Sequence, residues 1–114
     1  DQPDRDKLDA PSGTAVIMGN MIAELKGTTL DELAEYGREG RGACKLGGVG
    51  FHSLRAGDIT SYHKVYFGGM GERLEITHYS YGDDCFARGA VDCAAYLQGK
   101  PAGVYSIKDV FDLR

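Results

Sequence analysis

The sequence of 114 residues lacks any long hydrophobic run, which excludes a membrane-spanning helix. It also lacks a basic start followed by an apolar segment, so neither a signal peptide nor another targeting signal is read. The net charge is -4, and lysines and arginines are not interleaved with aromatic residues in a cluster. A nucleic-acid-binding surface is therefore not expected, whereas small anionic ligands stay possible through local geometry.

Metal-ligand and disulfide patterns are missing as well. The chain holds three cysteines and three histidines: Cys44, Cys85, Cys93, His52, His63 and His78. The cysteines are odd in number and have no Cys-x-x-Cys spacing, and the histidines lie on expected strands without metal-ligand spacing. We expect no metal site, a reducing cytoplasmic setting, and cysteines that pack as small hydrophobic residues in or near a core.

A nucleotide P-loop is absent, but the pattern of a different anion site occurs near the start of the chain. Lys7 comes shortly before the turn Pro11-Ser12-Gly13-Thr14, which opens an expected helix. Pro11 fixes φ, and Gly13 lets the backbone come close to a ligand. The free N–H groups of a first helical turn, together with the helix dipole, bind carboxylates as well as phosphates. We predict a carboxylate site here, with Lys7 as a movable charge; the alternative is that Ser12 only caps the helix.

The apolar periodicity and the turn residues predict two main helices and three central strands. The expected helices cover residues 14–26 and 84–98, with short helices at 30–33 and 105–113, and the expected strands cover residues 49–55, 59–67 and 72–81. In the first helix, Met18, Met21, Ile22 and Leu25 form the expected packed face. The glycine-rich segment 37–48 is expected to be a mobile loop near a ligand or a partner.

These elements indicate one α+β domain over residues 1–114, with a mixed, largely antiparallel sheet of about four strands and two main helices on one face. The three strands are expected to form consecutive antiparallel pairs. Alternation places Leu74, Ile76 and His78 on the inward face, where His78 is expected to be a hydrogen-bonded core residue. The other face carries Arg73, Glu75, Thr77, Tyr79 and Tyr81. An oligomer interface is expected for the tyrosines Tyr62, Tyr66, Tyr79 and Tyr81, with stacking on a ligand as the alternative.

Several motifs occur together in a specific order. They are Asp9-Ala10-Pro11-Ser12-Gly13-Thr14-Ala15, Gly37-Arg38-Glu39-Gly40, Gly50 to Ile59, Gly71 to His78, Phe86 to Ala90, and Gly103 to Phe111. In this order they resemble the C-terminal domain of the dihydrodipicolinate reductase family, and the resemblance covers nearly the whole chain from Lys7 onward.

The resemblance implies a function. Family members transfer a hydride from NADPH or NADH to a cyclic, doubly carboxylated, unsaturated substrate of lysine and diaminopimelate biosynthesis. An N-terminal Rossmann domain binds the cofactor, and no such domain is expected in this chain, so the isolated domain is expected to be inactive. The C-terminal domain binds the substrate, supplies the proton and forms the contacts of the homotetramer. Lys7 matches the motif lysine, which makes it the candidate catalytic residue, and Ser12, Gly13 and Thr14 match the carboxylate-binding turn.

The chain departs from the family at three positions. Pro3 and Asp4 stand where the motif His-His-x-x-Lys has its histidines, and Asp83 stands where a family arginine meets the substrate. Three explanations are open. The histidines lie before Asp1; the substrate has changed and carries an amine, with Lys7 or water as the proton donor; or the domain is a non-catalytic assembly or ligand-sensing module.

Overall fold

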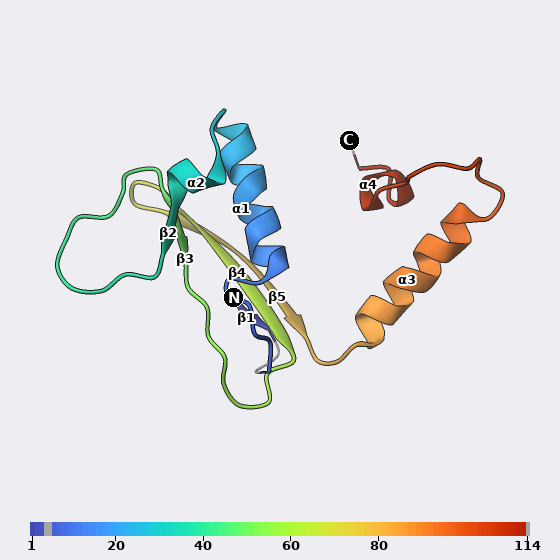
Figure 1. Ribbon diagram of the computed structural model, residues 1–114, viewed down its shortest axis with the longest axis horizontal. Coiled ribbons are helices and arrows are strands. Elements are labelled where there is room, and N and C mark those ends of the chain that lie inside the picture. Colours follow the sequence, from blue (N-terminus) through green and yellow to red (C-terminus); the bar gives the residue numbers. More distant parts are fainter. Residues whose placement is uncertain (4–5, 114) are drawn as a thin grey trace. The chain divides into compact units, whose positions relative to one another are not determined.

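The computed structural model describes residues 1–3 and 6–113 (Figure 1). The elements in chain order are β1 (Gln2–Pro3), α1 (Gly13–Leu25), α2 (Leu30–Leu33), β2 (Ala34–Tyr36), β3 (Val49–Phe51), β4 (Ser61–Gly68), β5 (Arg73–Ser80), α3 (Asp84–Leu97) and α4 (Ile107–Val110). The α+β class is confirmed. The chain forms two compact units, one ending at Tyr81 and the other beginning at Gly82.

Helix α1 lies within one residue of the predicted helix 14–26 at both ends, because its end signals are local. The Ser12 hydroxyl accepts a hydrogen bond from the main-chain N–H of Ala15, as an N-cap residue does. Gly27 follows the last turn at φ 68°, a left-handed conformation that glycine adopts without strain. The local sequence therefore fixes the length of α1.

The face of α1 that packs differs from the predicted one. The buried residues are small, namely Ala15, Gly19 and Ala23, whereas Met21 and Leu25 are exposed. The small residues let Leu30 and Phe51 approach the helix closely and complete the core of the first unit. The other two residues of the predicted face, Met18 and Ile22, are half-buried, so the prediction holds for them and is wrong for Met21 and Leu25, which lie on the side of α1 away from Leu30 and Phe51.

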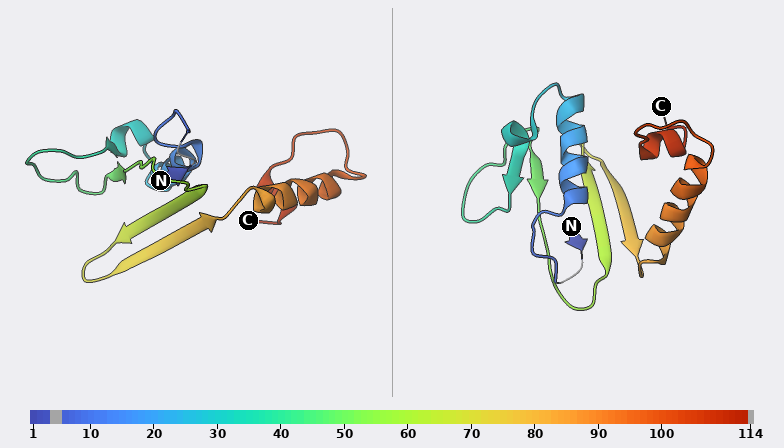
Figure 2. Two further views of the ribbon diagram at one scale, coloured as in Figure 1. Left: turned by 90° about the horizontal axis from the view of Figure 1, so that it is seen from below. Right: turned by 45° about the vertical axis from the view of Figure 1, so that its right-hand side comes forward.

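The strands are divided between two small sheets. One has the order β1-β4-β5 with antiparallel pairs, and the other is the parallel pair β2-β3. The expected antiparallel pairing of the first two central strands is therefore wrong: β3 ends at Phe51 and pairs with β2. The strands β4 and β5 form the expected hairpin. Figure 2 shows this hairpin on one side of the first unit and α1, α2, β2 and β3 on the other.

The two faces of the β4–β5 hairpin differ in character. On one face, Tyr62 packs against Tyr79 with ring centroids 4.6 Å apart, and Lys64 pairs with Glu75 at 2.6 Å. On the other face, His63 contacts the start of α1. Leu74 and Ile76, predicted to point inward, are 61% and 58% exposed, and His78 is also exposed. The prediction of a core histidine at position 78 is wrong because α1 covers β4 and leaves this part of β5 open.

The second unit contains α3 and α4. Asp83 is the N-cap of α3, and Ser106 and Asp109 form a reciprocal capping box at the start of α4, as their spacing predicts. The expected packed stripe on α3 is not buried: Phe86 is 53% and Leu97 is 48% exposed. Of the three cysteines, Cys44 and Cys85 are exposed and Cys93 is half-buried, so the first two do not pack in a core.

Candidate functional site

The predicted anion site lies where α1 begins, and Ser12 is its buried support. The Ser12 hydroxyl accepts from Ala15 N–H at 3.3 Å and lies 3.0 Å from Nε2 of His63 on β4. The main-chain N–H of Ser12 donates to the Asp1 carboxylate at 2.7 Å. The turn therefore holds the carboxylate of Asp1 on an N–H group at the helix start.

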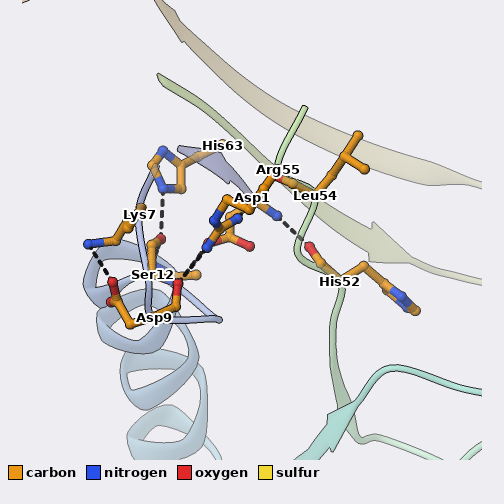
Figure 3. A network of polar contacts seen from close by, with 9 residues as sticks. Asp1, Lys7, Asp9, Ser12, His52, Leu54, Arg55 and His63 are labelled. Carbon is orange, nitrogen blue, oxygen red and sulfur yellow. Dashed lines mark hydrogen bonds and ion pairs between the residues drawn. The ribbon is translucent and has the colours of Figure 1, made fainter. Parts of the chain in front are cut away.

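Arg55 contacts both Asp1 and Asp9, which lie beside the turn (Figure 3). Its guanidinium lies 3.7 Å from the Asp1 carboxylate and donates to the carbonyl oxygen of Asp9 at 2.7 Å. The Asp1 side chain is 2% exposed and the Arg55 side chain 18%, so this ion pair is largely withdrawn from water. The backbone of Asp1 pairs with the segment after β3, through the carbonyl oxygen of His52 and the N–H of Leu54. The part of the loop from Asp9 to Ser12 is thus held at both ends, by Arg55 and by Asp1.

Gly13 and Thr14 are exposed at the open end of the helix. Their N–H groups belong to the first helical turn, where no partner exists inside the helix. A Cβ added at Gly13 would meet no atom within 4 Å, so a ligand has room to approach the backbone there. Of the three predicted turn residues, Gly13 and Thr14 therefore offer donors to a ligand, while Ser12 holds the turn in place.

Lys7 is exposed and pairs with Asp9 at 2.9 Å. The hydrogen bond from Lys7 lowers the pKa of the Asp9 carboxyl group below its usual value. The Asp9 carboxylate pairs with the Lys7 ammonium group in the same way as a substrate carboxylate would. A bound dicarboxylate would compete with Asp9 for the Lys7 ammonium group.

Sequence reasoning missed His63 and Arg55 as parts of this site. Burial, helped by nearby positive charge that includes Arg55, lowers the pKa of His63. The neutral imidazole is therefore favoured beside Ser12 at neutral pH. The residues around His63 in the sequence do not indicate this contact, because its partner, Ser12, lies far away in the sequence.

Of the three positions that depart from the family, Pro3 and Asp4 are neighbours near the start of the chain, and Asp83 belongs to the second unit. Pro3 is buried in β1 and pairs with Ser61 of β4, close in register to His63. Asp4 lies outside the described residues. Asp83 is exposed at the start of α3 in the second unit and caps no N–H with its side chain. Proline has no acidic proton to give, so position 3 cannot act as a general acid.

Two features are absent from the part of the chain that the structure describes. Across residues 1–3 and 6–113, no group of three or more histidine, cysteine, aspartate or glutamate side chains is placed to hold a metal ion. Over the same residues, no helix has both the length and the apolar character needed to cross a membrane.

The chain was compared with known proteins. Residues 1–111 match the family model described as dihydrodipicolinate reductase, C-terminus. The chain is 50% identical over 111 residues to the 4-hydroxy-tetrahydrodipicolinate reductase of Pseudomonas fluorescens strain Pf-5, a match that covers 96% of this chain and 41% of that relative. The same enzyme of P. fluorescens strain SBW25 is 49% identical over 110 residues, with 96% and 41% covered. That of Burkholderia pseudomallei strain 668 is 48% identical over 111 residues, with 96% and 42% covered.

The chain spans about two fifths of the length of these curated relatives, and the matched family model is that of their C-terminal part. The match and the order of motifs along the sequence agree over nearly the whole chain. The chain therefore belongs to the dihydrodipicolinate reductase family and corresponds to its C-terminal part.

Proposed function

We propose that residues 1–114 form the substrate-binding and oligomerisation domain of an NAD(P)H-dependent reductase of lysine and diaminopimelate biosynthesis. The observation that carries the proposal is the carboxylate-type helix start at Gly13 and Thr14, in a chain that belongs to this family over residues 1–111. The proposed ligand is a small cyclic dicarboxylate. A cytoplasmic location and a homotetrameric assembly complete the proposal.

In this proposal, one substrate carboxylate binds to the N–H groups of Gly13 and Thr14, and Lys7 leaves Asp9 to pair with it. Charge-assisted hydrogen bonds of this kind are about twice as strong as neutral ones, so they fix the orientation of the substrate ring. Lys7, or a water molecule that it holds, is then the donor of the proton. Ser12 keeps the turn in shape and does not move.

The nicotinamide cofactor, NADPH or NADH, supplies the hydride when bound. The residues present do not fit the dinucleotide: among the described residues, no strand leads through a Gly-x-Gly-x-x-Gly turn into a helix, and α1 follows a loop that starts with Lys7. We therefore assign the cofactor mainly to a domain outside this chain.

The proposal is tested by titrating the chain with pyridine-2,6-dicarboxylate, a planar mimic of the substrate dianion. We expect saturable amide shifts at Gly13 and Thr14. Lys7→Ala should weaken binding about 10-fold or more, since a hydrogen bond to a charged group contributes about 1.5–3 kcal/mol. The matched control, Lys108→Ala in α4, removes the same charge from the second unit and should leave the Kd unchanged. An absence of shifts in the unmodified chain would contradict the proposed ligand.

A second candidate is a non-catalytic assembly or ligand-sensing module, or a reductase with a changed substrate that carries an amine. The observation that favours it is Pro3, which is buried in β1 where the family motif has a histidine. Turnover decides between the candidates: the protein that carries this chain is mixed with reduced nicotinamide cofactor and the dihydrodipicolinate-pathway substrate. Activity no greater than that of a heat-inactivated sample would favour the second candidate.

A further inference from the structure

His63 lies directly behind the helix start that the proposed function uses. It is the third residue of β4, and its Nε2 atom is 3.0 Å from the hydroxyl oxygen of Ser12. Ser12 itself is 3% exposed. The contact joins the sheet to the first residue of the helix cap, across a long separation in sequence.

The Ser12 hydroxyl has two tasks that depend on one side-chain rotamer. It accepts the N–H of Ala15, which closes the cap, and it meets His63 on its other side. A hydroxyl group offers one proton and two lone pairs, so both interactions can be satisfied at once. A second partner for Ser12 therefore restricts the rotamer on which the cap bond to Ala15 depends. That bond closes the turn that contains Gly13 and Thr14, and so it limits the directions of their N–H groups.

We propose that His63 is a positioning residue: through Ser12, it holds the N–H groups of Gly13 and Thr14 in the direction that receives a substrate carboxylate. The ligand in this inference is that of the proposed function, on which the inference rests, whereas the contact between Ser12 and His63 is observed in the structure itself. His63 has no contact with the ligand in this scheme, and its effect passes through the Ser12 hydroxyl. The neutral imidazole that burial favours can accept the Ser12 proton or donate its own.

The test uses three variants of the chain and pyridine-2,6-dicarboxylate as the probe. His63→Leu removes the partner of Ser12, and His63→Gln puts an amide nitrogen near the position of Nε2. His78→Leu is the matched control, because His78 pairs with His63 across the hairpin but is exposed. We expect about a fivefold increase in Kd for His63→Leu, near-complete recovery in His63→Gln, and no change for His78→Leu. A fivefold change in Kd corresponds to the net contribution of one hydrogen bond.

A double-mutant cycle with Ser12→Ala separates positioning from a general loss of stability. If His63 acts through Ser12, the double variant Ser12→Ala with His63→Leu should bind as weakly as Ser12→Ala alone. Additive losses would overturn the proposal, as would unchanged binding in His63→Leu. Binding by His63→Gln as weak as that by His63→Leu would also overturn it, since the imidazole itself would then be required.

The amide spectrum of the ligand-free chain distinguishes a failure of this inference from a failure of the proposed function. His63→Leu should shift the Gly13 and Thr14 amide signals and accelerate hydrogen exchange at Ala15, whereas His78→Leu should not. If the unmodified chain does not bind the probe but these changes occur, the proposed ligand is wrong and the positioning role stands. If the ligand-free spectra are identical at these residues, the positioning role is wrong whatever the chain binds.

Discussion

At the scale of single residues, the candidate site is already engaged with carboxylates of its own chain. Asp1 accepts the Ser12 N–H and Asp9 holds Lys7. The two contacts differ in burial. Asp1 is withdrawn from water beside Arg55, so removing Arg55 would leave a buried charge unpaired, whereas the Lys7–Asp9 pair is exposed and opens at little cost. Asp1 is therefore a fixed part of the structure, and Asp9 is a competitor that a ligand can displace.

Asp9→Asn should tighten the binding of pyridine-2,6-dicarboxylate about two- to threefold. The change frees Lys7 from its partner, and exposed ion pairs contribute at most about 1 kcal/mol. Isothermal titration calorimetry measures the effect. Asp31→Asn, which removes the same charge from α2, is the control for the change in net charge. Weaker binding by Asp9→Asn would mean that Asp9 positions Lys7 for the ligand and does not compete with it.

At the scale of the elements, the packing of α1 depends on Gly19, a glycine inside the helix that marks neither of its ends. A Cβ placed on Gly19 would lie 2.6 Å from Cζ of Phe51 and 3.0 Å from Cδ1 of Leu30. The contact with Phe51 is far closer than two carbon atoms allow, and Phe51 belongs to the small core of the first unit. The glycine therefore sets the distance between α1 and the chain that packs on it.

Gly19→Ala should lower the free energy of unfolding by about 1–2 kcal/mol. Overpacking costs about 1–3 kcal/mol, and the better helix propensity of alanine returns at most about 1 kcal/mol of it. Urea denaturation followed by circular dichroism measures the difference. Gly13→Ala on the same helix is the control, since its Cβ meets open space. A stability equal to that of the unmodified chain would show that β3 can move away from α1.

The sequence predicts this helix better than it predicts its surroundings. Ser12 and Gly27 mark the ends of α1 because capping and left-handed turns depend on adjacent residues. The buried face could not be read in the same way, since the role of Gly19 is set by Phe51 from another element. The candidate site likewise has a part that the sequence predicts and a part that only the fold shows. The turn at Gly13 is visible in the sequence, whereas the contact of Ser12 with His63 exists only once β4 is placed beside α1.

At the scale of the whole molecule, the first unit leaves the tyrosine face of the β4–β5 hairpin without cover. Tyr66 and Tyr79 are 56% and 59% exposed, and Tyr81 is 94% exposed. Aromatic residues are enriched at protein interfaces, and large exposed apolar patches mark interaction sites. The Lys64–Glu75 pair lies among these rings and gives the surface a polar element that can fix the register of a partner. This face is our candidate for the proposed homo-oligomer interface.

Tyr79→Asp should reduce the oligomer to smaller species in sedimentation velocity at tens of micromolar, with the circular dichroism spectrum unchanged. The reason is that a carboxylate buried in an interface loses hydration without gaining a partner. Val104→Asp, at a fully exposed position of the second unit, is the control for added charge and should assemble as the unmodified chain does. If the unmodified chain is monomeric at these concentrations, the assembly proposal fails. If Tyr79→Asp assembles normally, the interface lies elsewhere, and the exposed Leu74 and Ile76 on the opposite face of β5 become the next residues to change.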